Sequence, residues 1–206
     1  PEKFWEEIAE TFTWRKKWDK VLKADLKNGK SEWFINGRLN ITENCIDRHL
    51  TENANKTAII WEPNNPNDPT KEYTFKELHT EVNRFSNILK NNGIEKGDRV
   101  VLYLPMIPEA AFAMLACARV GAIHSVVFAG FSAKALSDRI QDAEAKMIIT
   151  SDGLIRGTKK LLLRNIVADG IIDCPSIKTV LTIKHTGDDV KTNHLDKWYH
   201  EELKNA

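Results

Sequence analysis

Positively charged side chains gather in the stretch 151–160, in a chain whose formal net charge is only +1. Arg156, Lys159 and Lys160 lie there, and Arg164 follows about one helical turn later. A guanidinium fork together with an ammonium group suits the oxygens of a phosphate ester. A solvated basic loop without any ligand fits the same pattern, so these residues alone leave both interpretations open.

A second candidate binding segment is the run of small residues at 127–132. Ala129 and Gly130 would let another molecule approach the backbone closely. Ser132 then opens a helix, whose free N–H groups favour an anion. The alternative is a tight strand-to-helix turn that needs glycine for its geometry alone, and spacing by itself favours that alternative.

Other motifs that carry chemistry are missing from the sequence. The glycines at 153 and 157 do not meet the G-x-x-x-x-G-K-[ST] spacing of a P-loop, and no G-x-G-x-x-G occurs. The three cysteines and six histidines match no disulfide, zinc or nucleophile pattern. We therefore assign no catalytic residue and no metal ligand in this chain.

The elements that must position the two candidate segments alternate between strand and helix from about residue 72. Apolar runs predict strands at 99–104, 123–128, 146–150 and 178–183. Helices are predicted between them, at 74–93, 108–120, 132–143 and 161–172. This order of elements predicts an α/β fold with a mostly parallel sheet covered by helices.

The predicted topology also says where a ligand binds. In open α/β sheets, ligands lie beyond the carboxyl ends of the strands. That rule selects the loops that follow Leu104, Phe128, Thr150 and Ile183. The two candidate segments occupy two of these four loops.

The first 55 residues differ from the rest. A helix is predicted at the start, from the spacing of Phe4, Trp5, Ile8 and Phe12, and another at 44–50. Four of the six tryptophans lie in this part: Trp5, Trp14, Trp18 and Trp33. We expect residues 1–55 to be a helical and extended arm, packed by these tryptophans on a main domain at 56–206. A tryptophan cage around a ligand is the alternative.

A strand at 57–61 and a surface loop at 62–71, rich in proline and asparagine, connect the two parts. The chain is 42% hydrophobic and 29% charged, which is typical of a globular protein. Its balanced charge gives no electrostatic case for nucleic acid or an anionic membrane as partner. We expect a cytoplasmic protein with small-molecule partners. Because both ends resemble cut points, we also expect the remainder of a longer polypeptide.

Four longer segments are more specific than any short motif. They read WFINGRLNITENCIDRHL at 33–50, VVLYLPMIPEA at 100–110, RVGAIHSVVFAGFS at 119–132 and LSDRI at 136–140. All four resemble the N-terminal part of AMP-forming acetyl-CoA synthetases, which are adenylate-forming ligases. The likeness runs from about Phe4 to Leu203.

The resemblance implies a reaction in two steps. Acetate attacks the α-phosphate of ATP and gives acetyl-AMP and pyrophosphate, and the thiol of CoA then takes the acetyl group and releases AMP. Magnesium and basic groups offset the phosphate charge. The family has a large N-terminal domain and a small mobile C-terminal domain, and this chain resembles the first part of the large one.

The resemblance also implies a CoA site. In the family, a loop similar to arginine-glycine-glycine-lysine contacts the phosphorylated nucleotide end of CoA. The matching positions here are Arg156, Gly157, Thr158 and Lys159, and the turn at Phe128, Ala129 and Gly130 matches a segment that lines the same site. Thr158 stands where the family often has glycine. Lys159 stands where some members have arginine, and it lacks the bidentate fork.

The family's phosphate loop, adenine and ribose contacts, acyl pocket and catalytic lysine have no counterpart in these residues. We therefore expect this chain alone to catalyse no reaction and the ATP and magnesium sites to lie outside it. A propionate- or acetoacetate-specific ligase stays open because the acyl pocket is missing. Two further alternatives also stay open. One is a non-catalytic, flavodoxin-like module that binds a phosphorylated cofactor, and the other is a structural piece completed by the missing remainder.

Overall fold

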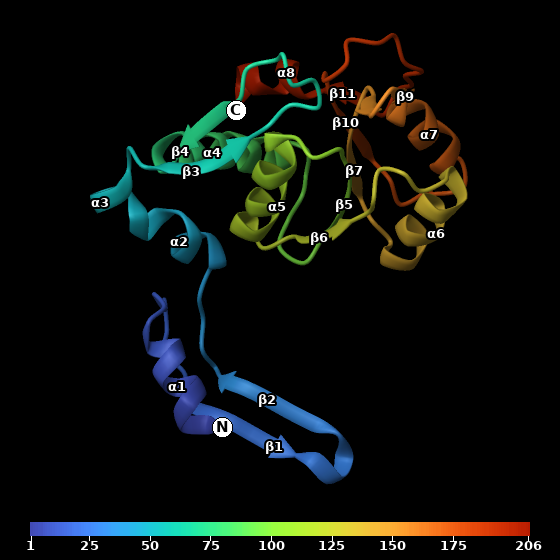
Figure 1. Ribbon diagram of the computed structural model, residues 1–206. Coiled ribbons are helices and arrows are strands. Elements are labelled where there is room, and N and C mark those ends of the chain that lie inside the picture. Colours follow the sequence, from blue (N-terminus) through green and yellow to red (C-terminus); the bar gives the residue numbers. More distant parts are fainter. The chain divides into compact units, whose positions relative to one another are not determined.

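The computed structural model describes residues 1–206, which form two compact units, Pro1–Ala54 and Asn55–Ala206 (Figure 1). None of the helices combines the length and the apolar character that crossing a membrane requires. The packing of the first unit on the second stays a prediction.

The first unit contains a hairpin that the sequence analysis did not predict. Its elements are α1 (Glu2–Glu10), β1 (Lys20–Asp25), β2 (Lys30–Ile35), α2 (Ile41–Cys45), a 3-10 turn (Asp47–His49) and α3 (Leu50–Asn53). Strands β1 and β2 pair antiparallel. The segment predicted as one helix at 44–50 is helical but divided among α2, the 3-10 turn and α3, and it begins earlier, where Asn40 accepts the N–H of Thr42 at 3.0 Å.

Aromatic rings hold this first unit together. The ring centroids of Trp14 and Trp18 lie 5.0 Å apart, and that of Phe34 lies 5.5 Å and 5.1 Å from them, respectively. Trp33 reaches Trp5 at 6.3 Å. Such aromatic pairs each contribute about 0.5–1.5 kcal/mol beyond the area that they bury. All four tryptophans of this region therefore have aromatic partners inside the unit.

The second unit is built on a five-stranded sheet in the order β11-β10-β7-β5-β6. The strands are β5 (Arg99–Tyr103), β6 (Ile123–Val126), β7 (Met147–Ser151), β10 (Thr179–Ile183) and β11 (Asp196–Trp198). Every neighbouring pair is parallel, which confirms the predicted sheet and its four strands. The sequence analysis missed β11, because three residues in a polar segment carry no periodic signal.

Helices cover both faces of this sheet (Figure 1). Helices α4 (Phe75–Asn91) and α5 (Pro108–Val120) contact each other on one face, and α6 (Ala133–Ala143) and α7 (Leu163–Gly170) do so on the other. Val101 belongs to the core beneath α6 and α7, while its neighbours Val100 and Leu102 point to the opposite face and are also fully buried. This burial on both sides is what the continuous apolar runs predicted.

Smaller elements surround the sheet. Strands β3 (Thr57–Trp61) and β4 (Lys71–Thr74) pair antiparallel, as do β8 (Leu154–Arg156) and β9 (Lys159–Leu161). The last elements are α8 (Tyr199–Glu202), which contacts β10 and β11, and a 3-10 turn at Leu203–Asn205. The predicted capping box at the start of α4 is confirmed, since Glu77 N–H donates to Thr74 Oγ1 at 3.2 Å and Thr74 N–H donates back to Glu77 Oε2 at 2.8 Å.

The strand order reverses at β5. The chain runs from β5 to β6 on one side and then crosses β5 to reach β7 on the other side, with β10 and β11 following outward. A flavodoxin-like sheet has the same order of strands, and its ligand lies at the carboxyl ends of the strands beside this reversal. The topology therefore points to the loops after β5, β6 and β7.

Strand β6 leaves one edge of the sheet unpaired, because it pairs only with β5. Ile123 and Val126 on this strand are 56% and 62% exposed. Since an exposed apolar edge strand favours pairing with another chain, we expect the 206-residue chain to self-associate. Ile123→Lys should reduce this association in sedimentation velocity.

Ile172→Lys is the matched control, because Ile172 is 76% exposed and lies outside the sheet. It should leave the association unchanged. A monomer at every concentration, or equal effects of both substitutions, would contradict the prediction.

Candidate functional site

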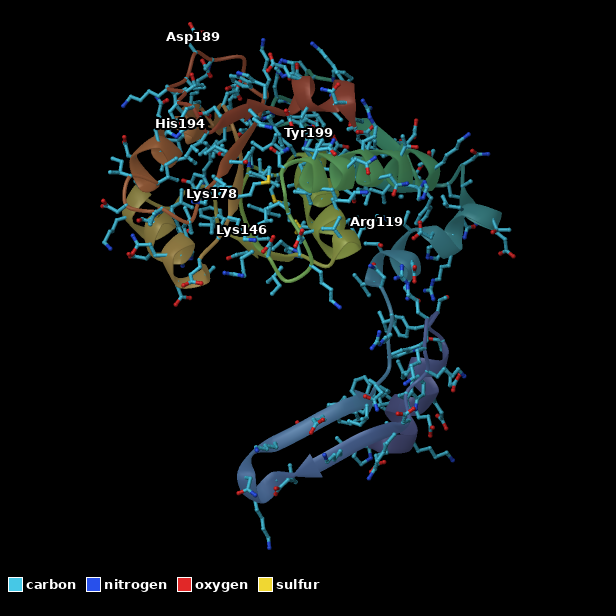
Figure 2. All side chains as sticks on the ribbon, turned by 180° about the vertical axis from the view of Figure 1, so that it is seen from behind. Arg119, Lys146, Lys178, Asp189, His194 and Tyr199 are labelled. Atoms are coloured by element: carbon cyan, nitrogen blue, oxygen red, sulfur yellow. The ribbon has the colours of Figure 1, made fainter.

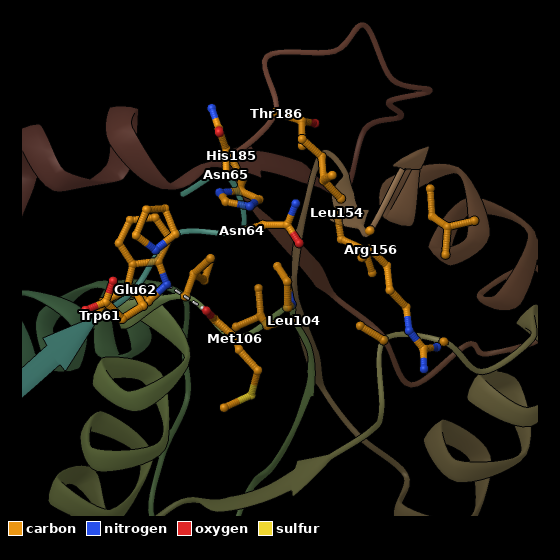
Figure 3. A pocket seen from close by; sticks show the side chains of 18 of the residues that line it. Trp61, Glu62, Asn64, Asn65, Leu104, Met106, Leu154, Arg156, His185 and Thr186 are labelled. Atoms are coloured by element: carbon orange, nitrogen blue, oxygen red, sulfur yellow. Dashed lines mark hydrogen bonds between the residues drawn. The ribbon is translucent and has the colours of Figure 1, made fainter. Parts of the chain in front are cut away.

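A cavity of about 900 Å³ lies at the carboxyl edge of the sheet (Figure 3). It is lined by residues of all four loops that the sequence analysis selected: 104–107 after β5, 126–130 after β6, 154–157 and 161 after β7, and 185–186 after β10. The fifth wall comes from 61–66 and 68, in the segment predicted as a plain surface loop. Its proline and asparagine content indicated a loop but not what that loop faces.

The basic stretch folds as a hairpin rather than as the open loop that we expected. Arg156 on β8 pairs with Lys159 on β9, and Gly157 and Thr158 form the turn between them. Gly157 has a φ of +59°, which suits the first position of a two-residue hairpin turn. Thr158 takes the second position without a positive φ, so a side chain there is tolerated. A hairpin this short leaves no alternating pattern in the sequence.

Arg156 brings the two candidate segments together. It lines the cavity, and its guanidinium carbon lies 5.6 Å from the centroid of the Phe128 ring, as in a cation–π contact. No carboxylate pairs with it. In Figure 3, Arg156 and Trp61 stand on opposite sides of the cavity. A free guanidinium therefore faces a cavity whose walls are largely apolar.

The other basic residues of the stretch differ from Arg156. Lys160 pairs with Asp188 at 2.9 Å, and Lys159 is exposed but does not line the cavity. Arg164 is fully buried and donates to both carboxylate oxygens of Asp196, at 2.6 and 2.5 Å. Including Arg164 in the basic cluster was therefore wrong, because its charge neutralises a residue of β11.

The turn after β6 presents an aromatic ring to the cavity. Phe128 is 58% exposed, and its ring stands nearly perpendicular to that of Phe131, with centroids 5.8 Å apart. Ala129 packs into the core instead, and a Cβ at Gly130 would lie 2.5 Å from the Phe128 ring. Ser132 caps its own helix by accepting the N–H of Ala135 at 3.3 Å. The small residues at 129 and 130 thus make room for the protein's own packing.

The opposite wall was not predicted from the sequence. Trp61 ends β3 and donates its indole N–H to the carbonyl oxygen of Met106 at 2.8 Å, which ties it to the loop after β5. His185 and Asn65 also line this cavity (Figure 3). The strand-end rule had selected the loop after Ile183 that carries His185, but no sequence motif singled this residue out.

A buried carboxylate organises the loops at this edge. Asp152 follows β7, is fully buried, and accepts the N–H groups of Gly153 at 2.8 Å, His185 at 2.8 Å, Thr186 at 2.9 Å and Gly187 at 2.7 Å. Burial alone raises the pKa of a carboxyl group, but these N–H groups lower it further than burial raises it. The pKa of Asp152 is therefore held below its ordinary value.

Neither cysteine chemistry nor a metal cluster stands out elsewhere. Burial raises the pKa of Cys117 to about 12, so this thiol in α5 is a small core residue. No group of three or more His, Cys, Asp or Glu side chains is arranged to hold a metal ion. Lys146 and Lys178 lie at the amino end of the strands, away from the loop with Asp189 (Figure 2).

The lowered pKa of Asp152 predicts how stability depends on pH. Its ionised form stabilises the fold fully above the ordinary carboxyl pKa of 3.8, and this contribution is lost as the pH falls through the lower folded pKa. Asp152→Asn should cost about 2–3 kcal/mol of unfolding free energy at neutral pH. Urea titrations of the 206-residue chain, followed by circular dichroism, should show this cost shrinking below about pH 4. A cost that is constant into acid would contradict the assignment.

The chain matches known protein families along its length. A family model described as "AMP-binding enzyme" matches residues 46–204, and one described as "Acetyl-coenzyme A synthetase N-terminus" matches residues 1–45. Acetyl-coenzyme A synthetase 2 of Pseudomonas putida is 49% identical over 207 residues, which cover 100% of this chain and 32% of that protein. Acetyl-coenzyme A synthetase of Alcanivorax borkumensis is 52% identical over 211 residues, with the same two shares.

Among solved structures, an acetoacetyl-CoA synthetase from Streptomyces lividans superposes with a TM-score of 0.88 at 26% identity, over 98% of this chain and 31% of that one. The chain thus spans about a third of the length of the relatives that it matches. The model of the AMP-binding enzymes covers most of the chain, including every strand of the sheet and every wall of the cavity. The chain therefore belongs to the AMP-binding enzyme family.

Proposed function

We propose that this chain is the first part of an AMP-forming acetate–CoA ligase, which converts ATP, acetate and CoA into acetyl-CoA, AMP and pyrophosphate through acetyl-AMP. The proposal is supported by near 50% identity to acetyl-coenzyme A synthetases along the whole chain. The solved acetoacetyl-CoA synthetase shares 26% identity, so acetate is favoured over acetoacetate as the acid. Propionate remains the alternative. A cytoplasmic location and the remainder of a longer polypeptide belong to the same proposal.

Within that enzyme, this chain contributes part of the CoA site. The observation that carries this role is Arg156, a guanidinium without a carboxylate partner that lines a cavity at the strand ends. A phosphate ester supplies the missing negative charge, and the guanidinium fork matches two of its oxygens. The Phe128 ring, whose centroid lies 5.6 Å from the guanidinium carbon, attracts the cation and so favours its position.

The rest of the hairpin adds to this anion site. Lys159 is paired with Arg156 across the two strands, so both side chains leave the same face. Gly157 and Thr158 place two backbone N–H groups at the tip of the turn, where no group of the chain accepts them. Together, the four positions offer two cations and two amide donors to the phosphorylated end of CoA. Phe128, Ala129 and Gly130 form the adjoining wall.

The remaining chemistry belongs to the rest of the enzyme in this proposal. ATP supplies the adenylyl group that activates acetate, with pyrophosphate as the leaving group, and Mg²⁺ bound with ATP would offset the phosphate charge. Residues of this chain bind and orient CoA, and they do not touch the reacting carboxylate. We expect the complete polypeptide to catalyse acetate-dependent exchange of pyrophosphate into ATP and to form acetyl-CoA. The 206-residue chain alone should do neither, and activity in it would contradict the proposal.

Charge reversal at Arg156 tests the CoA site. Arg156→Glu in the complete polypeptide should raise the KM for CoA by about 10- to 100-fold, because it removes a charge-assisted hydrogen bond and adds repulsion. The KM for dephospho-CoA, which lacks the ester phosphate, should change far less. Steady-state kinetics with both substrates measures this difference.

Lys178→Glu is the matched control. It changes the net charge by the same amount as Arg156→Glu, but Lys178 lies at the amino end of β10, away from the cavity. It should leave both KM values unchanged. Equal losses for CoA and dephospho-CoA in Arg156→Glu would argue against a contact with the ester phosphate.

A further inference from the structure

The hairpin that carries Arg156 projects from the sheet by a short connection. Only Asp152 and Gly153 separate the end of β7 at Ser151 from the start of β8. The hairpin strands pair with each other and with no strand of the main sheet. Contacts at the base must therefore fix the direction in which Arg156 points.

We propose that Asp152 is a positioning residue for CoA, whose carboxylate clamps the loop after β10 against the base of the β8–β9 hairpin and so sets the place of Arg156 over the cavity. This inference rests on the CoA site proposed above. Asp152 is not among the residues that line the cavity, so it acts through its neighbours rather than on the ligand.

The clamp itself consists of four hydrogen bonds to one carboxylate. One N–H comes from the hairpin side, at Gly153, and the other three come from His185, Thr186 and Gly187 in the loop after β10. Oxygen atoms of an ionised carboxylate only accept hydrogen bonds, so all four N–H groups can converge on them. An amide in the same place would turn an NH₂ group toward at least one N–H donor.

Two further contacts join the same pair of segments. Lys160 on β9 pairs with Asp188 in the loop at 2.9 Å. Gly153 allows the closest approach, because a Cβ there would lie 2.6 Å from Thr186 Oγ1 and 3.0 Å from the carbonyl oxygen of Leu161. Ser151 Oγ donates to the carbonyl oxygen of Gly153 at 2.8 Å and fixes the turn between them. The hairpin base and the loop after β10 are thus held at close range by several contacts.

The clamp joins cavity walls to each other. Leu154, Ile155, Arg156 and Gly157 on the hairpin and His185 and Thr186 on the loop all line the cavity. Loss of the carboxylate should therefore misplace Arg156 relative to Phe128 without opening the sheet core. A misplacement of about 1 Å in a binding group can cost about 100-fold in rate.

Asp152→Asn in the complete polypeptide tests the inference. We expect the KM for CoA to rise by about tenfold or more, while acetate-dependent pyrophosphate exchange, which needs no CoA, stays within about twofold of wild type. The KM for dephospho-CoA should rise less, because the effect passes through Arg156. In the double variant with Arg156→Glu, the KM for CoA should be no higher than in Arg156→Glu alone. Fully multiplicative effects would overturn the inference.

A control separates positioning from general loss of stability. Val167→Ala truncates a fully buried side chain of α7 in the core cluster beneath the same sheet, and Val167 makes none of the four hydrogen bonds of the clamp. It should lower the thermal midpoint and leave the KM for CoA unchanged. An equal rise of this KM in Val167→Ala would show that Asp152 contributes stability alone.

Asp188→Asn is a second variant, for the case that Asp152→Asn does not fold. Asp188 keeps 25% of its side chain exposed and lies outside the hydrophobic core, so its loss leaves that core intact. Simple electrostatics predicts a lower KM for CoA, because a negative charge near an anion site disappears. Loosening of the hairpin predicts a higher KM instead. A lower or unchanged KM would contradict the inference.

Hydrogen exchange distinguishes failure of this inference from failure of the proposed function. In protein without any ligand, amides at 154–161 should exchange faster in the Asp152→Asn variant than in wild type, whereas those of β5 should not. This readout needs no ligase activity. Unchanged protection of the hairpin would overturn the positioning role even in an active ligase.

Discussion

Parallel pairing of the strands is the constraint from which the candidate site follows. Two neighbouring strands can run in the same direction only if the chain returns to the amino edge after each one, so every strand of the sheet ends at the same carboxyl edge. Segments more than 100 residues apart in sequence, such as Trp61 and His185, thereby line one cavity. Strands are added to the sheet on one side of β5 and then on the other, and this reversal of strand order places the cavity between the loops that follow β5, β6 and β7.

Buried charges then decide which loops at that edge are rigid. Arg164 and Asp196 neutralise each other inside the protein and fix the short strand β11 to α7. Asp152 instead binds four backbone N–H groups and fixes two loops. Removing one partner of such a group leaves the other buried without compensation, which is costly. Arg156 differs from both, because no carboxylate pairs with it and its guanidinium lies against the Phe128 ring.

Much of this arrangement could be predicted from the sequence. Continuous apolar runs between helices gave the four long strands and their parallel order, and the strand-end rule selected the loops around the cavity. Arg156 and Phe128 could be named because they lie in those loops. The hairpin at 154–161 and β11 could not be predicted, since strands of three residues show no periodicity.

Partnerships between distant residues were equally hidden. Arg164 resembled a member of the basic cluster, because its partner Asp196 follows 32 residues later. Asp152 resembled an ordinary turn residue, because its partners are backbone N–H groups that no side-chain pattern reveals. Pairing of this kind depends on tertiary structure, so the spacing of neighbouring residues in the sequence does not predict it.

The β8–β9 hairpin separates the proposed anion contacts from the packed core of the domain. Its outer four positions, from Arg156 to Lys159, make no hydrogen bond to the main sheet, whereas its base is fastened by Asp152 and Lys160. Substitutions at the tip can therefore accumulate without disturbing the folding of the domain. Natural variation in selectivity among related enzymes should concentrate at this tip, with the residues of its base changing much more slowly.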